Sequence, residues 1–386
     1  MPELFLGLMS GTSLDGIDLM LAEIDTPFAL VETRFRHLPF DTDTRAALQP
    51  MVEKGCDSTM LPALNAHMGE RYGAAIKDFL QETGTRPEQV TAIGMHGVTF
   101  RHTPDPTDTP LGKGRGTQQL GDPFIVAART GIPVIYDFRH ADMAFGGQGA
   151  PMVPFLEHLL FRHECIGRVV LNLGGIANLT YLPPDGKTVL AFDSGPANMI
   201  MDALMQVHLG KPGAFDQDGR LSAQGRVIDD LLKECLAEPY LALAPPKSTG
   251  RELFGEDYAA KFLAYGKNHP FADLMATAAK FTAITVAEAL KRWAPEPWQP
   301  ETFEHLVVSG GGVHNQTLLA MLAEHLPWMQ IMATNDLEPK VDPDAKEALL
   351  MAAFAWAHVH EVPGNFPSVT GADRAVVLGA RTGRIG

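Results

Sequence analysis

The chain has 386 residues, of which 45% are hydrophobic and 20% charged, and this composition is typical of globular proteins. It is longer than one hydrophobic core usually extends, so we expect two domains. The formal net charge of −15 argues against a nucleic-acid partner, because phosphate backbones are bound by clustered Lys and Arg side chains.

Cys56, Cys165 and Cys235 are far apart and lack C-x-x-C spacing, which is typical of a reducing compartment without disulfides or a zinc site. The first residues enter an apolar strand pattern rather than a signal peptide. No run of about 18 apolar residues occurs. We therefore expect a cytoplasmic protein that does not contact membranes.

Residues 7–18 combine glycines, hydroxyl groups and carboxylates between two apolar runs, 4–9 and 16–24, which we predict to be strands. Glycines allow close approach to a ligand, and successive N–H groups can form an anion-binding concavity. The stretch is not a P-loop, because it lacks G-x-x-x-x-G-K-[ST]. A phosphate-binding turn and an ordinary Gly-rich hairpin both remain possible readings.

The rest of the first half reads as alternating strands and helices. We predict a strand at 30–39, helices at 44–54 and 61–81, and an exposed loop at 104–116, which is rich in Pro, Gly and Thr. Predicted buried strands at 90–95 and 132–137 each end in a polar cluster. In open α/β sheets ligands bind outside the carboxyl ends of strands, so both clusters are candidate substrate walls.

The second half repeats this order of elements. Its predicted strands and one helix are 168–173, 177–182, 188–192, helix 196–208, 305–309 and 329–333. The order β-β-β-α-β-α-β thus occurs twice, each time opening on a Gly-containing hairpin. We place the domain transition at the Gly-rich segment 145–151, giving domains 1–150 and 151–386, with a C-terminal tail that could pack back on the first domain.

Asp193 is the strongest candidate for a catalytic group. It is predicted to end a strand, with Pro196 in the first turn of the next helix. A carboxylate in that place could act as a general base, or it could simply satisfy N–H groups at the start of the helix.

Three further features are candidates for ligand contact. The run Ser309–Asn315 follows a strand and precedes a helix, which favours binding of nucleotide phosphates. The basic segment 245–252 could hold an anion or merely separate two helices. Arg139 and Arg101 could bind carboxylate or phosphate groups, although exposed salt bridges are the alternative.

Ordered motifs along nearly the whole chain resemble those of the anhydro-N-acetylmuramic acid kinase family, within the sugar kinase, Hsp70 and actin superfamily. The matching segments are 7–18 (GLMSGTSLDGID), 96–97 (HG), 119–123 (QLGDP), 137–139 (DFR), 146–151 (GGQGAP), 172–178 (NLGGIAN), 246–252 (PKSTGRE) and 364–372 (GNFPSVTGA).

The resemblance implies a duplicated, actin-like (ribonuclease H-like) α/β fold with an interdomain cleft. It implies an enzyme that uses ATP and Mg²⁺ to convert 1,6-anhydro-N-acetylmuramic acid to N-acetylmuramic acid 6-phosphate in peptidoglycan recycling. Asp193 would take the proton of the water that opens the ring at C1, while O6 attacks the γ-phosphate.

The resemblance also implies a homodimer and assigns site residues. The nucleotide contacts would be Gly11, Thr12, Ser13, Leu14, Asp15, Gly16, Ile17, Asp18, Asn172, Gly174, Gly175, Gly195, Gly310, Gly311, Gly312 and Asn315. Thr99, Arg139 and Glu347 would line the sugar site, with Arg139 as the partner of the lactyl carboxylate. The metal ligands remain open among Asp15, Asp18 and Asp193.

Two positions depart from the family pattern. Val98 stands where the family often has Gln, and Met351 where it often has Phe, which leaves details of sugar contact open. Two other functions remain as alternatives: a kinase of the same fold acting on a free sugar hydroxyl, and a slow nucleotide-gated ATPase of the Hsp70 or actin kind. A long C-terminal peptide-binding domain or filament-forming insertions would favour the second function, and the sequence shows neither.

Overall fold

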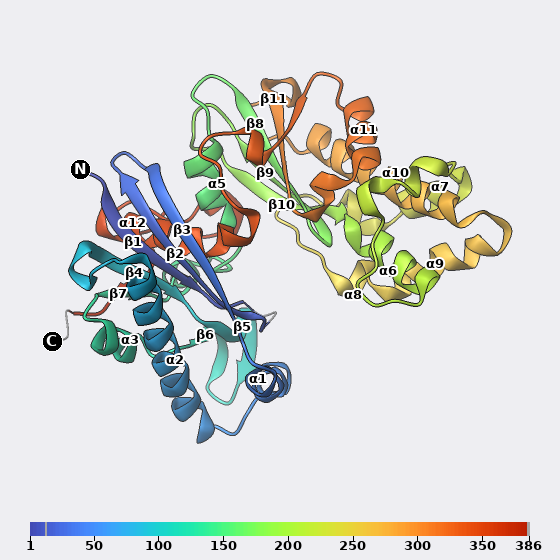
Figure 1. Ribbon diagram of the computed structural model, residues 1–386. Coiled ribbons are helices and arrows are strands. Elements are labelled where there is room, and N and C mark those ends of the chain that lie inside the picture. Colours follow the sequence, from blue (N-terminus) through green and yellow to red (C-terminus); the bar gives the residue numbers. More distant parts are fainter. Residues whose placement is uncertain (12–13, 384–386) are drawn as a thin grey trace. The chain divides into compact units, whose positions relative to one another are not determined.

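The computed structural model describes residues 1–11 and 14–383, and the chain divides into two compact units (Figure 1). Unit 1 contains Met1–Leu160 together with the chain from Val341 on, and unit 2 contains Phe161–Lys340. Each unit has its own sheet and hydrophobic core. No helix in the described part of the chain is long and apolar enough to span a membrane.

The sheet of unit 1 has the strand order β13-β7-β4-β1-β2-β3. Its first three strands form an antiparallel meander, whereas β4 and β7 run parallel to β1. The strands are β1 (Glu3–Met9), β2 (Gly16–Asp25), β3 (Ala29–Pro39), β4 (Val90–His96), β7 (Val134–Tyr136) and β13 (Ala380–Arg381).

Helices pack around this sheet, and local capping residues mark some of their ends. Asp41 accepts a hydrogen bond from the Thr44 amide at the start of the first helix, and Gly84 ends the second in the left-handed conformation. The helices of unit 1 are α1 (Thr42–Lys54), α2 (Met60–Thr83), α3 (Pro123–Thr130), α4 (His140–Ala144), α5 (Val153–Phe161), α12 (Lys346–Val359) and α13 (Pro367–Thr370).

Helix α12 packs directly against β1 and β4, although it lies far from them in sequence. A Cβ atom on Gly7 would fall 1.8 Å from the Ala348 carbonyl oxygen, and one on Gly94 would fall 1.9 Å from that of Met351. These glycines let the helix backbone touch the sheet. The chain from Val341 on therefore packs in unit 1, in line with the expectation that the C-terminal tail could pack back on the first domain, and unit 2 begins at Phe161 rather than at residue 151.

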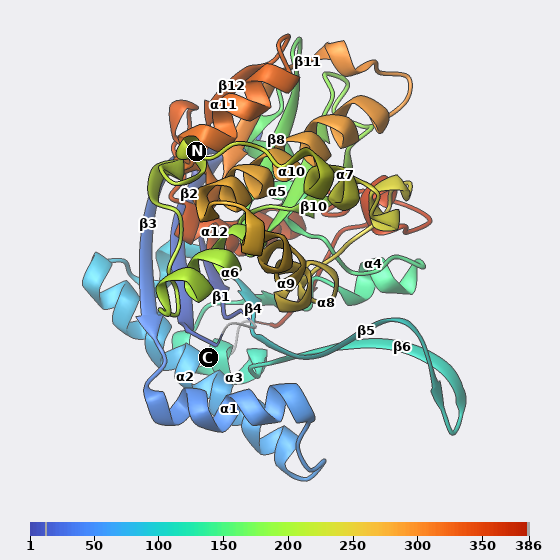
Figure 2. The same ribbon diagram turned by 90° about the vertical axis from the view of Figure 1, so that its right-hand side faces the viewer.

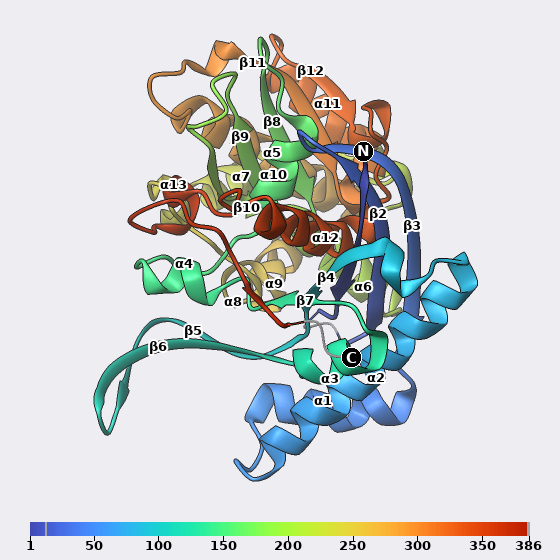
Figure 3. The same cartoon turned by 90° about the vertical axis from the view of Figure 1, so that its left-hand side faces the viewer.

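The segment expected to be a loop at 104–116 instead belongs to a hairpin of β5 (Val98–Thr109) and β6 (Gly112–Leu120). Figures 2 and 3 show it as an extended two-stranded arm. Its threonines stabilise the pairing, since Thr103 Oγ1 donates to the Gly116 carbonyl at 3.0 Å. The prediction was wrong because Pro and Gly, which usually mark loops, here sit in exposed strands.

The sheet of unit 2 has the order β10-β9-β8-β11-β12. Again the first three strands are antiparallel, and β11 and β12 run parallel to β8. Both units thus repeat one topology, which confirms the predicted duplicated, actin-like α/β fold. The strands are β8 (Gly167–Leu173), β9 (Ile176–Leu182), β10 (Leu190–Pro196), β11 (Phe303–Ser309) and β12 (Gln330–Ala333).

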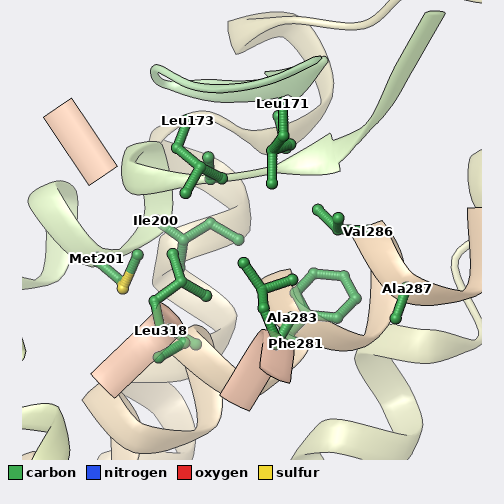
Figure 4. Close-up of a cluster of buried hydrophobic side chains, with 14 of the residues drawn as sticks. Leu171, Leu173, Ile200, Met201, Phe281, Ala283, Val286, Ala287 and Leu318 are labelled. Atoms are coloured by element: carbon green, nitrogen blue, oxygen red, sulfur yellow. The ribbon is translucent and has the colours of Figure 1, made fainter. Parts of the chain in front are cut away.

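The core of unit 2 lies between this sheet and its helices. Figure 4 shows Leu171 and Leu173 of β8 facing Ile200 of α6 and Phe281 of α10. All four side chains are buried. The helices are α6 (Asn198–Leu209), α7 (Asp229–Leu236), α8 (Arg251–Phe254), α9 (Glu256–Tyr265), α10 (Phe271–Arg292) and α11 (Gln316–His325).

We expect Gly7→Ala to destabilise unit 1, because the new methyl group must push α12 away from β1. Overpacking of this kind should lower the Tm by at least about 4 °C. The matched control is Gly114→Ala in the exposed hairpin, where the nearest atom to a new Cβ is Thr109 Cγ2 at 3.9 Å. Equal Tm values for the two variants would contradict the close helix–sheet contact.

Candidate active site

The turn between β1 and β2 is anchored to the end of β4. The Ser10 amide donates to the His96 carbonyl at 3.1 Å, and Ser10 Oγ donates to the Gly16 carbonyl at 2.8 Å. Leu14 adopts a positive φ of 53°, an uncommon conformation for a residue other than Gly. Of the predicted phosphate contacts, Thr12 and Ser13 lie outside the described residues.

Several predicted phosphate contacts in this turn also have structural roles. The side chains of Leu14 and Ile17 pack in the core of unit 1, so only their backbones could meet a ligand. A Cβ on Gly16 would lie 2.3 Å from the Leu38 carbonyl oxygen, so this glycine is required for packing against β3. Gly11 is partly exposed and Asp15 exposed.

Carboxylates gather beside this turn. Asp18 is partly buried and contacts His37 Nδ1 at 2.6 Å. Burial raises the pKa of Asp18, with His37 opposing the shift and Asp15 and Asp344 adding to it. Solvent reaches Glu347, yet the protein around it desolvates the group enough to raise its pKa, and Asp18 and Asp15 raise it further. The result is a concentration of negative charge.

Arg139 lies near Glu347 within unit 1, as their mutual electrostatic effects show. Its Nε donates to His96 Nε2 at 3.1 Å, and its Nη1 donates to the Gly149 carbonyl at 2.8 Å. Burial lowers its pKa, against the influence of Glu347. The guanidinium is therefore fixed and partly desolvated, which suits binding of an anion.

Thr99, which was predicted to line the sugar site, and Arg101, which was predicted only as a possible partner of a carboxylate or phosphate group, differ in how far other contacts engage them. Thr99 is the second residue of β5, pairs with Gln119 and is partly exposed. Arg101 is engaged elsewhere: it donates to the Val52 carbonyl of α1 and lies 5.0 Å above the Phe100 ring. Arg101 thus has a structural role and is a weaker candidate for anion binding than Arg139.

Asp193 lies inside β10, which is a correction to the predicted strand end. The strand continues to Pro196, and its register shifts at a β-bulge between Asp193 and Gly195. Consequently Pro196 ends the strand rather than starting the helix, and α6 begins at Asn198. A bulge re-aims the side chain of the bulged strand, which is common beside active sites.

The Asp193 carboxylate is partly buried and has no cationic partner within 4 Å in the described residues. Its Oδ2 accepts a hydrogen bond from the Thr249 amide at 2.9 Å. Burial raises its pKa, the Thr249 amide lowers it, and Glu252 and Lys247 have smaller opposing effects. In the described residues no hydrogen bond engages Oδ1, so this oxygen is available to a water molecule.

The basic segment 245–252 turns out to position Asp193. The Asp193 amide donates to the Lys247 carbonyl at 3.2 Å, and the Tyr240 hydroxyl donates to the Asp193 carbonyl at 2.8 Å. Lys247 Nζ lies 4.7 Å from the centre of the Tyr240 ring and donates to the Leu241 carbonyl at 3.3 Å. Burial lowers the pKa of Lys247. This lysine therefore supports the segment instead of reaching out as an anion ligand.

The Gly-rich turns of unit 2 meet one another. A Cβ on Gly310 would lie 2.7 Å from Asn172 Oδ1, and one on Gly312 would lie 2.5 Å from Leu173 Cβ. The Asn198 amide donates to the Gly174 carbonyl at 3.0 Å. The ends of β8 and β11 and the start of α6 therefore come together, as a shared ligand site requires. Gly175 and Gly311 are exposed there.

Two of the predicted nucleotide contacts, Asn315 and Gly195, have structural roles. Asn315 is 7% exposed, and its side chain accepts a hydrogen bond from the Leu318 amide at the start of α11. It is an N-cap, which explains an Asn in this position. Gly195 is buried at the bulge, with Thr285 Oγ1 3.2 Å from where a Cβ would stand.

The carboxylates beside the β1–β2 turn are of the chemical type that binds Mg²⁺. Among the described residues, no three His, Cys, Asp or Glu side chains form a ready metal cluster. Mg²⁺, however, usually binds through one or two carboxylates together with waters and substrate phosphates. Asp18, raised in pKa by burial and by its acidic neighbours, offers such a carboxylate, and a cation there would relieve the repulsion.

The sequence profile described as "Anhydro-N-acetylmuramic acid kinase" matches residues 3–383. The chain belongs to the anhydro-N-acetylmuramic acid kinase family. It is 41% identical over 385 residues to a protein of that name from Salinibacter ruber, covering 97% of this chain and 94% of the relative. It is likewise 41% identical over 381 residues to one from Pasteurella multocida, covering 97% and 96%.

Among solved structures, the ADPNP-bound activator of 2-hydroxyisocaproyl-CoA dehydratase from Clostridium difficile matches at 12% identity. It has a TM-score of 0.41 and covers 94% of this chain and 96% of its own. A likeness this distant carries no argument about this chain. The fold assignment rests instead on the strand order that the sheets of the two units share.

Sequence reasoning missed several supporting residues. Tyr240 and Thr249 hold Asp193, and His96 holds Arg139. The only sequence signals were the basic segment 245–252 and the polar cluster after the strand at 90–95. Neither identified a partner, because each contact joins residues distant in sequence.

We expect Asp193→Asn to raise the Tm near neutral pH. Because burial raises the pKa of Asp193, the native state holds the proton more tightly than the unfolded state does, and stability falls as pH rises through the raised pKa. Asn carries no charge and can still accept from Thr249. The gain in Tm should shrink toward about pH 4, near the unfolded pKa of Asp.

Asp185→Asn is the matched control. Despite slight desolvation, hydrogen bonds from Lys187 and Thr188 lower the pKa of Asp185, so its ionised form stabilises the fold. This variant should lower the Tm near neutral pH, and the opposite sign checks the assignment. If Asp193→Asn melted below the parent protein at both pH values, the burial of an ionised carboxylate would not be the dominant effect.

Proposed function

We propose that this chain is an ATP-dependent kinase that opens the 1,6-anhydro ring of 1,6-anhydro-N-acetylmuramic acid by hydrolysis and phosphorylates O6. The products are N-acetylmuramic acid 6-phosphate and ADP, and the reaction belongs to peptidoglycan recycling. Family membership over residues 3–383 supports the substrate and the reaction class. The observation that carries the mechanism is the Asp193 carboxylate, with one oxygen held by Thr249 and the other available to water.

In this mechanism Asp193 is the general base. O6 is tied into the acetal of the anhydro sugar, so the substrate has no free 6-hydroxyl. A water oxygen bonds to C1 while its proton passes to Asp193 Oδ1, and the C1–O6 bond breaks. The released O6 then bonds to the γ-phosphorus, and ADP leaves. A raised pKa makes Asp193 a stronger proton acceptor than an ordinary carboxylate.

Arg139 and Glu347 bind the sugar in this proposal. The guanidinium of Arg139 matches the planar lactyl carboxylate and can hold it through two N–H groups. Glu347 is close enough to influence the pKa of Arg139 and is open to solvent, so it can accept hydrogen bonds from sugar hydroxyl or amide groups. Thr99 adds a third polar contact on the side of the hairpin.

The nucleotide phosphates would be bound by backbone amides of the β1–β2 turn and of the turns at 174–175 and 310–312. Mg²⁺, when bound, neutralises the charge that develops on the transferring phosphate. We propose Asp18 and Asp15 as the residues that hold it, directly or through water. We further propose that the enzyme is cytoplasmic and homodimeric. The free cysteines and the family resemblance support this part of the proposal.

The direct test is turnover of 1,6-anhydro-N-acetylmuramic acid and ATP by the parent protein and by Asp193→Asn. We expect the variant to lose about 10²- to 10⁴-fold in kcat, with KM values little changed, because one base serves both ring opening and phosphorylation. Products are followed by mass spectrometry. Asp185→Asn, remote from the base, is the control. Normal formation of the 6-phosphate by Asp193→Asn would refute the assigned role.

A further inference from the structure

Arg139 is fixed on two sides while one end of its guanidinium stays free. Nε donates to His96 Nε2 at 3.1 Å, and Nη1 donates to the Gly149 carbonyl at 2.8 Å. Within the described part of the chain, no hydrogen bond engages Nη2. The two N–H groups of Nη2 are therefore available to a ligand.

His96 can accept from Arg139 only as a neutral ring that carries its proton on Nδ1. The side chain is 3% exposed. Burial, with help from the nearby charge of Arg139, lowers the pKa of His96 to about 3, so Nε2 remains an acceptor throughout the physiological range. His96 is also the last residue of β4 and pairs with Met9, which places it beside the β1–β2 turn.

Gly149, the second partner of Arg139, is itself held by a buried carboxylate. Asp142 is 1% exposed, and its Oδ2 accepts from the Gly149 amide at 2.7 Å. Its Oδ1 accepts from Asn365 Nδ2 and from Thr370 Oγ1, both at 2.6 Å. All three donors are neutral groups, so the buried Asp142 side chain is satisfied by hydrogen bonds that the C-terminal segment supplies in part.

The loop around Gly149 has little freedom to rearrange. A Cβ on Gly147 would lie 2.1 Å from Asp142 Oδ2. The Gln148 amide donates to the Thr370 carbonyl at 2.8 Å, and the Asp373 amide donates to the Phe145 carbonyl at 2.7 Å. The C-terminal segment thus fixes the loop, and the loop fixes one side of Arg139.

We propose that His96 and Asp142 are positioning residues, which orient the Arg139 guanidinium so that Nη2 meets the carboxylate of the substrate. His96 acts by accepting from Nε, and Asp142 acts by holding Gly149. The proposal rests on the proposed function, in which the substrate carries a lactyl carboxylate. Preorganisation of this kind lowers the entropy cost of holding a long side chain when the ligand binds.

The test compares two sugars, 1,6-anhydro-N-acetylmuramic acid and 1,6-anhydro-N-acetylglucosamine, which lacks the lactyl carboxylate. The measured quantity is the ratio of their kcat/KM values, replaced by the ratio of calorimetric dissociation constants where one sugar is not turned over. His96→Leu removes the acceptor and should lower the ratio about tenfold while leaving KM for ATP unchanged. His96→Gln retains an oxygen acceptor and should restore most of the ratio.

Asp142→Asn should also lower the ratio, because the amide cannot accept from all three donors. Arg139→Ala gives the full loss for comparison. His360→Leu is the matched control, because it breaks the 2.7 Å contact between His360 and Glu3. Glu3 is the first residue of β1, whereas the residue that pairs with His96 is the last residue of that strand. It should leave the ratio unchanged even if the Tm falls.

Three results would be decisive against the proposal. If His96→Leu and Asp142→Asn reduced kcat/KM for both sugars equally, their role would be structural only. If Arg139→Ala left the ratio unchanged in a protein that does turn over the anhydro acid, the kinase assignment would stand but the positioning proposal would be overturned. If the parent protein turned over neither sugar, the proposed function itself would fail.

Discussion

The proposed chemistry depends on the Asp193 carboxylate, which is kept partly out of water and has no cationic partner within 4 Å among the described residues. In the described part of the chain, one hydrogen bond reaches its side chain, from the Thr249 amide, and burial raises its pKa. A carboxylate paired with Lys or Arg would be a weak base, and a fully solvated one would bind water without orienting it. The β-bulge in β10 and the segment 245–252 together create this intermediate environment.

The duplicated topology could be predicted because local sequence patterns indicate its strands and helices. Apolar runs with Gly-rich turns mark the strands of both meanders, and 3.6-residue periodicity marks α2, so these elements, apart from β10, matched their predicted ranges closely. The position of Asp193 at the cluster after an apolar run also identified it as a candidate. Its place inside the strand could not be read, because Ser-Gly-Pro normally ends strands and only the pairing with β9 shows that β10 continues.

The remaining features depend on contacts between distant segments. Nothing near residue 348 in the sequence indicates that α12 packs on Gly7 and Gly94. The same holds for Asp142, which a sequence reading treats as one acid in a polar cluster, although residues more than 200 positions later supply two of its donors. Conversely, the sequence suggests Asn315 and Gly16 as ligand contacts, yet both also have structural roles. Asn315 caps α11, and Gly16 allows β3 to approach closely.

The most direct test of the central claim follows the oxygen atom that Asp193 is proposed to activate. The parent protein is given the anhydro sugar and ATP in ¹⁸O-labelled water, and the product is quenched before its anomeric oxygen exchanges with solvent. The account predicts one ¹⁸O on C1 of the 6-phosphate and none in the phosphate group. Formation of the 6-phosphate without label on C1 would contradict it, since the ring would then have opened without an activated water.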